Sequence, residues 1–224
     1  MFTGLVQAVG RVAGVEKSAA GLRLVVEAPG WDHVPRRESS VAVNGCCLTV
    51  ANEPSGRGSP IAFDVIHETL QRTTLGGLAP GSRVNLEHAA TPQTLMGGHL
   101  VQGHVDGVGE IVRVVRGGEE GWRVRIRPGR GSDGEGLMQY IVPKGSICVD
   151  GVSLTVAAVD LAGERTGEGG EFEVALIPTT LERTTLAGLE EGRRVNLEVD
   201  LVAKTIVHWA KNFGPGKGWG GAAP

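Results

Sequence analysis

Short apolar runs, separated by glycine or polar turn residues, make up most of the chain. Residues 122–127 (WRVRIR) alternate strictly between apolar and charged positions, which is typical of a half-buried strand. Further runs rich in β-branched residues lie at residues 22–28, 40–43, 47–51, 61–66 and 83–87. About six such strands in each half, with turn signals roughly every 10 residues, predict small all-β domains built as barrels or sandwiches.

The pattern of the first half returns in the second half. Four blocks recur in the same order, and the spacing between the copies grows along the chain, so the second copy contains insertions in its polar, glycine-rich stretches. The matching blocks are residues 4–12 and 103–111, 44–50 and 150–156, 68–75 and 179–186, and 81–87 and 192–198. We therefore predict a duplicated domain, with an N-terminal copy at residues 1–97 and a C-terminal copy at residues 98–200.

A helical period replaces the strand pattern after the second copy. Residues 201–213 carry one apolar stripe, and Asp200 stands where a helix N-cap is expected. The pattern alone favours packing of this stripe against the chain's own domain, and an oligomerisation helix is the alternative. Residues 214–224 (GPGKGWGGAAP) are predicted to be a disordered tail. The stripe consists of Val202, Ile206, Trp209 and Phe213.

One short helix is expected inside the second copy. Thr179 and Glu182 have the spacing of a capping box, which predicts a helix with Thr179 as its N-cap. Gly188 follows as a stop signal. The equivalent segment of the first copy has the same stop but a weaker start.

Composition and charge narrow the classes of partner. The chain has 22 Lys and Arg against 25 Asp and Glu, a net charge of −3, and only 4% aromatic residues. This balance argues against a nucleic-acid partner and against a membrane patch, and no apolar run reaches the ~18 residues of a membrane span. Three cysteines, two of them adjacent, are not a disulfide framework, and the N-terminus lacks signal-peptide features. We expect a soluble cytoplasmic protein whose partner is a small molecule or another protein.

Motifs of the common cofactor and metal enzymes are absent from the sequence. There is no GxxxxGK[ST] phosphate loop, no GxSxG nucleophile and no HExxH metal motif. His99 and His104 lie five residues apart without a third ligand nearby. We therefore expect no metal site, and taken singly these histidines are more often structural or surface residues.

The two copies place small polar residues at equivalent positions. Cys47 aligns with Ser153, and Thr49 aligns with Thr155. Residues at i and i+2 of a strand face the same side, so each pair would face one side of its barrel. Cys47 alone is interpreted either as a small buried hydrophobe or as a thiol in a ligand pocket. The duplicated pattern leads to the hypothesis of two similar small-molecule pockets, one in each copy.

The repeated blocks closely resemble the riboflavin synthase family, which is built from two lumazine-binding repeats. The resemblance covers residues 1–213 and rests on motifs that occur in order in both copies. They are MFTGLVQ, NGCCLTV, HETLQRTTLG, GGHLVQGHVDGVG, DGVSLTV, IPTTLERTTL and RVNLEVD. The resemblance implies an all-β fold of two tandem six-stranded Greek-key barrels plus a C-terminal α-helix, through which three chains associate as a homotrimer.

The resemblance further implies a transferase reaction. Two molecules of 6,7-dimethyl-8-ribityllumazine dismutate, because one donates a four-carbon unit to the other, giving riboflavin and 5-amino-6-ribitylamino-pyrimidinedione. Each barrel binds one lumazine, and the productive pair forms between the N-terminal barrel of one chain and the C-terminal barrel of a neighbour. No cofactor is implied, since the lumazine is its own electron sink. Lumazine synthase is a further candidate partner.

The resemblance also implies which residues form the two pockets. The first pocket is expected to contain Gly4, Leu5, Val6, Cys47, Leu48, Thr49, Asp64, Val65 and Ile66. The second is expected to contain Gly103, His104, Val105, Lys144, Ser153, Leu154, Thr155, Ala175, Leu176 and Ile177. The residues implied in catalysis are Cys47, His104, Ser40, Thr3, Phe2 and Asp200. For Asp200, a helix cap and an active-site acid both remain open, and Cys46 is expected to face away from the pocket by strand alternation.

The two pockets are not equivalent, so one can serve as donor site and the other as acceptor site, with the assignment open. The aligned pairs that differ are Leu5 and His104, Asp64 and Ala175, and Glu38 and Lys144. One alternative is a non-catalytic lumazine- or flavin-binding protein of the antenna type on the same fold, and another is a structural trimer with degenerate pockets. Retention of a small polar residue in both copies, together with the intact MFTG start, favours the enzyme.

Overall fold

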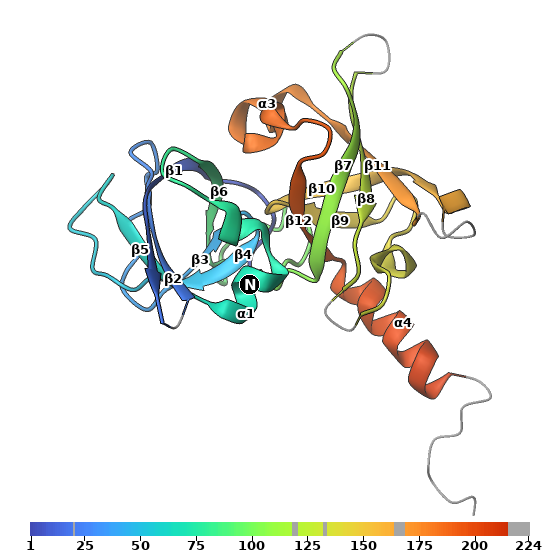
Figure 1. The fold of residues 1–224 in the computed structure, drawn as a ribbon, viewed down its shortest axis with the longest axis horizontal. Coiled ribbons are helices and arrows are strands. Elements are labelled where there is room, and N and C mark those ends of the chain that lie inside the picture. The colour runs from blue at the N-terminus through green and yellow to red at the C-terminus, as the bar shows by residue number, and fades with distance from the viewer. Residues whose placement is uncertain (20, 118–120, 132–133, 164–168, 215–224) are drawn as a thin grey trace, which may run out of the picture.

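The computed structural model describes residues 1–19, 21–117, 121–131, 134–163 and 169–214, which form two six-stranded antiparallel sheets and a C-terminal helix (Figure 1). The first sheet consists of β1 (Ala8–Ser18), β2 (Gly21–Glu27), β3 (Ser40–Val43), β4 (Cys46–Thr49), β5 (Ile61–Ile66) and β6 (Arg83–His88). The second consists of β7 (Gly107–Val115), β8 (Trp122–Pro128), β9 (Ser146–Val149), β10 (Val152–Asp160), β11 (Glu171–Leu176) and β12 (Arg194–Val199). The predicted all-β fold with two tandem six-stranded units and a C-terminal helix is confirmed.

Equivalent strands occupy equivalent places in the two sheets. The first has the order β4-β3-β6-β1-β2-β5. The second has the equivalent order β10-β9-β12-β7-β8-β11, and pairing of β11 with β10 closes it into a barrel. The ladder that closes the second barrel begins where Val156 pairs with Val174. The edges of the first sheet meet at a single bridge between Val50 and Phe63. Below, the first sheet is called the first barrel and the second sheet the second barrel.

An apolar interior stabilises each barrel. Alternate strand residues point inward and are buried, and each fully buried Leu, Ile or Phe side chain contributes about 1.5–3 kcal/mol relative to exposure. The first interior includes Leu24, Phe63, Leu75 and Leu86, and the second includes Ile111, Ile126, Phe172 and Leu197. Because each interior fills its own barrel, functional side chains must lie on outward-facing strand positions or on the connecting segments.

A reciprocal pair of asparagine contacts joins the two barrels. The Asn85 side-chain amide in β6 donates to the carbonyl oxygen of Asp150 at 2.8 Å. The Asn196 side-chain amide in β12 donates to the carbonyl oxygen of Asn44, also at 2.8 Å. All four residues are buried, so these bonds are shielded from water and fix one barrel against the other about a pseudo-twofold axis.

Short helices connect the strands. They are α1 (His67–Arg72), η1 (Thr74–Gly77), η2 (Leu137–Tyr140), α3 (Pro178–Arg183) and η3 (Thr185–Gly188). The predicted capping box is wrong, because α3 begins at Pro178 and its N-cap is Ile177, without a side-chain cap. Proline fits the first turn of a helix, where its missing N–H is not needed, so the N-cap lies two residues before the predicted Thr179.

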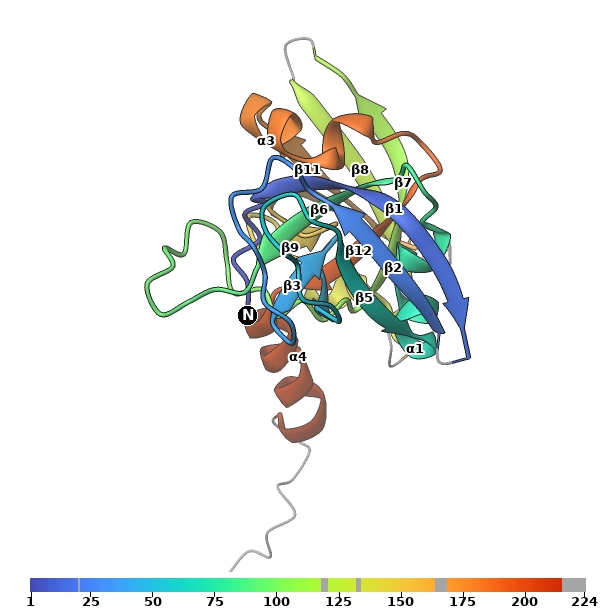
Figure 2. The same ribbon diagram turned by 90° about the vertical axis from the view of Figure 1, so that its left-hand side faces the viewer.

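The C-terminal helix α4 (Leu201–Phe213) projects away from both barrels, as both views show (Figures 1 and 2). The Asp200 carboxylate accepts from the backbone N–H groups of Val202 and Ala203, so the predicted N-cap is present. The apolar stripe from Val202 to Phe213 is 45–64% exposed, which contradicts its packing on the chain's own domain. Apart from Gly214, the predicted tail lies outside the described residues. In the described part of the chain, no helix is long and apolar enough to cross a membrane.

Candidate active site

Strand alternation places Cys47 and Ser153 on the outer faces of their barrels. Cys46 is buried in the first interior, whereas Cys47 is partly exposed on the opposite side of β4, as expected. Cys47 lies across the strand pair from Ala42, and Ser153 lies across from the fully buried Cys148. Two more outward pairs extend these faces, namely Ser40 with Thr49 and Ser146 with Thr155. The outer face of β4 with the end of β5 is called the first site, and that of β10 with the end of β11 the second site.

Each site is completed by a segment from the other barrel. Residues 3–7 and 102–106, called the incoming segments, precede the first strands of the two barrels. The Cys47 N–H donates to the carbonyl oxygen of Gly103 at 2.8 Å, and the Ser153 N–H donates to that of Gly4 at 2.8 Å. Val105 packs on the first interior and Val6 on the second. The predicted grouping is therefore wrong in one respect: residues 103–105 belong with Cys47, and residues 4–6 belong with Ser153.

Glycine is required where the incoming segments cross the strands. Gly4 and Gly103 have φ angles of +73° and +79°, a region that disfavours side chains. A Cβ added at Gly4 would lie 2.6 Å from Cβ of Ser153, and one added at Gly103 would lie 2.6 Å from Cβ of Cys47. These distances are too short for any side chain, so the close approach of the backbone depends on both glycines.

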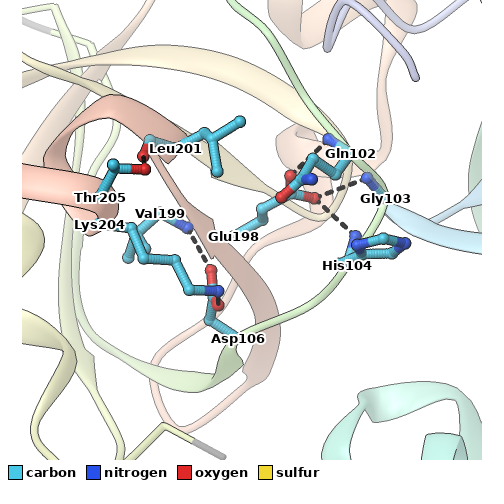
Figure 3. Close-up of polar contacts among 9 residues, drawn as sticks. All are labelled: Gln102, Gly103, His104, Asp106, Glu198, Val199, Leu201, Lys204 and Thr205. Carbon is cyan, nitrogen blue, oxygen red and sulfur yellow. Dashed lines mark hydrogen bonds and ion pairs between the residues drawn. The ribbon is translucent and has the colours of Figure 1, made fainter. Parts of the chain in front are cut away.

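Two buried carboxylates hold the incoming segments. Glu87 in β6 accepts from the N–H groups of Thr3 and Gly4 at 2.6 and 3.0 Å and from the Thr3 hydroxyl at 2.8 Å. Glu198 in β12 accepts from the N–H groups of residues 102, 103 and 104 at 2.5, 2.9 and 3.0 Å (Figure 3). Burial raises the pKa of Glu87, and it raises the pKa of Glu198 to about 7, although the backbone donors act in the opposite direction. The signal for both was the repeated RVNLE block, which sequence reasoning used only as evidence of duplication.

Phe2 and Thr3 lie between the barrels. Phe2 is fully buried, and its N–H donates to the carbonyl oxygen of Val101 at 2.7 Å. The ring packs under the chain at Gly103, where an added Cβ would lie 2.8 Å from it. Thr3 is 3% exposed and its hydroxyl is bonded to Glu87. Both candidates are therefore buried away from open surface, Phe2 beneath one incoming segment and Thr3 within the other.

His99, which the sequence alone indicates as a structural or surface histidine, lies at the second site. Its Nδ1 is 2.7 Å from the hydroxyl of Ser153. Its Nε2 is buried and finds no partner in the described part of the chain. Burial lowers the pKa of His99, while Asp200 acts in the opposite direction, so burial favours the neutral form of the ring. The preceding Gly98 brings the chain against residues 3–7, because a Cβ there would lie 2.1 Å from the Thr3 carbonyl oxygen.

The remaining candidates differ between the sites. At the first site, Arg23 holds Asp64 with two bonds of 2.8 and 2.9 Å, and this pair lowers the pKa of Asp64. The equivalent residue Ala175 has no charge to pair. Lys144 is exposed in a turn with φ of +65°, matching Glu38 at +67° in the first copy. His104 is exposed on its incoming segment, and Ile66 and Ile177 are exposed just before the short helices.

The described residues contain no group of three or more His, Cys, Asp or Glu side chains that could hold a metal ion. A cavity of about 670 Å³, within the size range of small-molecule sites, lies beside the incoming segment at residues 3–7. Its lining includes Leu5, Val6, Leu95, Glu182 and Arg183. Residues of the first copy and of α3 therefore meet around one cavity next to the second barrel.

Comparison with known proteins places this geometry in a family. The family model for the lumazine binding domain matches residues 3–89 and 102–200. The riboflavin synthase of Mycobacterium bovis is 46% identical over 220 residues, covering 96% of this chain and all of that protein. The riboflavin synthase of Escherichia coli is 39% identical over 210 residues, covering 92% of this chain and 90% of that one.

Solved structures give the same result. LumP complexed with 6,7-dimethyl-8-(1'-D-ribityl) lumazine is similar with a TM-score of 0.70 and 26% identity, covering 89% of this chain and 99% of that one. LumP complexed with riboflavin has a TM-score of 0.70 and 27% identity with the same coverage. Two matched repeats, full-length relatives and a shared fold agree. The chain therefore belongs to the riboflavin synthase family of duplicated lumazine-binding domains.

Proposed function

We propose that the chain is a riboflavin synthase, which converts two molecules of 6,7-dimethyl-8-ribityllumazine into riboflavin and 5-amino-6-ribitylamino-pyrimidinedione. The observation that carries this proposal is the presence of two sites of the same construction in one chain, one for each substrate molecule. Each has a small polar side chain on the outer face of a strand and an incoming segment that crosses this strand at a glycine. The extent of identity to riboflavin synthases favours the enzyme over the LumP-like alternative.

The proposed mechanism uses the protein to orient two rings and to move protons. Holding two reactants in register can provide effective molarities of about 10⁵–10⁸ M. Proton transfer is assigned to His104, Cys47 and Ser40 around the first site, and to Asp200 and Lys144 around the second. His99 joins them as a neutral imidazole bonded to Ser153. Phe2 acts by packing under the incoming segment at Gly103, and Thr3 acts by anchoring its own segment to Glu87. The reaction needs no cofactor, because the lumazine itself accepts the electrons.

We further propose that the first site of one chain faces the second site of a neighbour in a homotrimer assembled through α4. The exposed apolar stripe of α4 supports this arrangement. Lumazine synthase remains a candidate partner. A cytoplasmic location is also proposed, and it is supported by three free thiols, which fit a reducing compartment.

The activity is tested by mixing the protein with 6,7-dimethyl-8-ribityllumazine and following visible absorbance. A riboflavin synthase forms riboflavin steadily, at half a molecule for each lumazine consumed. Binding without conversion would instead support the LumP-like alternative. If the protein neither binds nor converts lumazine, the remaining alternative is a structural trimer with degenerate pockets.

Replacing Cys47 tests the first site. Cys47→Ala should lower turnover per folded protein, whereas Cys47→Ser should retain a larger share, because Ser153 provides a hydroxyl at the equivalent position. Cys46→Ala is the control: burial raises the pKa of the Cys46 thiol to about 12, which makes it inert, so its loss should reduce stability by about 1–2 kcal/mol and leave turnover unchanged. Equal losses of turnover for Cys46→Ala and Cys47→Ala would contradict the assignment.

A further inference from the structure

Gln7 and Asp106 occupy the same place in the two copies. Each ends an incoming segment and accepts from a backbone N–H at the end of its barrel's last strand. Gln7 accepts from His88 at 3.0 Å, and Asp106 accepts from Val199 at 2.9 Å. A neutral amide oxygen is therefore sufficient for this bond, and the negative charge of Asp106 calls for another explanation.

The second carboxylate oxygen of Asp106 is bonded to the ammonium group of Lys204 in the first turns of α4 (Figure 3). The Asp106 side chain is 8% exposed, so this ion pair is largely shielded on the carboxylate side. The first copy has no such partner, since residues 89–106, which follow β6, are all described and form no helix. The charge thus occurs in the copy that is followed by a helix.

The segment that Asp106 ends is the one that crosses the first site. Glu198 binds the N–H groups of residues 102–104, and the Gly103 carbonyl accepts from Cys47. Lys204 therefore fixes one end of this segment, and Glu198 fixes the other (Figure 3). Besides burial, the nearby Asp106 carboxylate contributes to raising the pKa of Glu198, and Lys204 supplies a positive charge beside Asp106. Lys204 of α4 is thus linked to His104 through Asp106, which lies two residues after His104 in the same segment.

We propose that Asp106 and Lys204 are positioning residues for the first site, because their ion pair joins the start of α4 to the incoming segment and so holds this segment, and with it His104, in place. The proposal rests on the proposed function in taking this site as a lumazine site. Without the ion pair the segment must be ordered when the ligand binds. Affinity at the first site should then fall while turnover at saturating substrate is largely kept.

Three variants isolate this ion pair. Asp106→Gln copies Gln7 and keeps an acceptor for the Val199 N–H, and Lys204→Met keeps the apolar stem of the lysine. Both should raise KM about fivefold with kcat changed less than about twofold, and the double variant should be no worse than either single one. Lys211→Met is the matched control, since Lys211 pairs with Glu135 near the other end of α4.

Two measurements do not depend on turnover. Hydrogen exchange at residues 102–104 should become about fivefold faster in Lys204→Met, while residues 3–4 of the first copy stay unchanged. Titration with riboflavin should show one weakened site of two, with the sedimentation of the assembly unaltered. Equal exchange in both segments, additive single effects, or the same result for Lys211→Met would overturn the proposal. If the wild type binds riboflavin but makes none, the proposed function fails. Hydrogen exchange and riboflavin titration still test whether the Asp106–Lys204 ion pair holds residues 102–104 in place.

Discussion

A chain that ends at Asp200 should fold into two barrels that no longer assemble, and its turnover should fall by at least about a hundredfold. The reason is that Ile206 and Trp209 are 59% and 51% exposed on the apolar face of α4, where they are available to neighbouring chains. If the reacting pair forms between chains, separated chains lose the orientation that brings two lumazines together. Sedimentation velocity and riboflavin formation at equal concentrations of folded protein measure both effects.

A second variant separates assembly from the contacts of Lys204. The full-length chain with Ile206→Ser and Trp209→Ser keeps the ion pairs of Lys204 and Lys211 with the second barrel, and only the apolar face is altered. It should behave like the truncated chain in sedimentation and in turnover. An intact trimer in either variant would show that the chains do not assemble through the apolar face of α4.

Replacing Asp150 by asparagine should raise the free energy of unfolding at pH 7 by about 3 kcal/mol. Asp150 is fully buried, and burial raises its pKa from 3.8 to about 6. The hydrogen bond from the Asn196 N–H and the charge of Arg193 lower this pKa, but burial has the larger effect. Its equivalent in the first copy is Asn44, whose side-chain oxygen accepts from the Asn85 N–H at 2.8 Å. Asp150 accepts from the Asn196 N–H at the same distance, so asparagine can make the same bond.

The direction in which stability changes with pH follows from the number of protons bound by the folded and unfolded chains. Between pH 3.8 and about 6 the folded chain keeps a proton on Asp150 that the unfolded chain releases, so stability falls as pH rises through this window. About two pKa units correspond to about 3 kcal/mol. Urea unfolding at pH 4 should therefore show little difference between wild type and Asp150→Asn, and at pH 7 the full difference. Asn44→Asp is the converse control and should destabilise only at the higher pH. Parallel pH profiles for wild type and Asp150→Asn would disprove the assignment.

Most of the fold could be predicted from the repeated sequence blocks. Alternation in WRVRIR and in the NGCCLTV and DGVSLTV blocks predicted strands whose inward and outward faces the structure reproduces. The start of α3 was misplaced because Pro178 competes with Thr179 for the first turn. The position of the stripe on α4 was predicted, but a period of 3.6 residues does not say which surface an apolar face meets.

The grouping of the sites was not readable from the repeat. Aligning two copies shows that Gly4 matches Gly103, and it does not show which barrel each residue touches. The contact of Gly4 with Ser153 joins residues far apart in the chain, and it exists only because the barrels pack about a pseudo-twofold axis. His99 was missed for the same reason, since its partner Ser153 is distant in sequence.

The asparagine contacts between the barrels have a consequence for how the two halves could diverge. Each copy offers the other the surface that it receives, which is the form of an isologous dimer interface. In a true homodimer every substitution appears twice, so the two halves must stay identical. Joining them in one polypeptide keeps the symmetric contact of Asn85 and Asn196 while releasing all other positions from that constraint. A single gene product can thus present leucine at one crossing segment and histidine at the other on an unchanged symmetric frame.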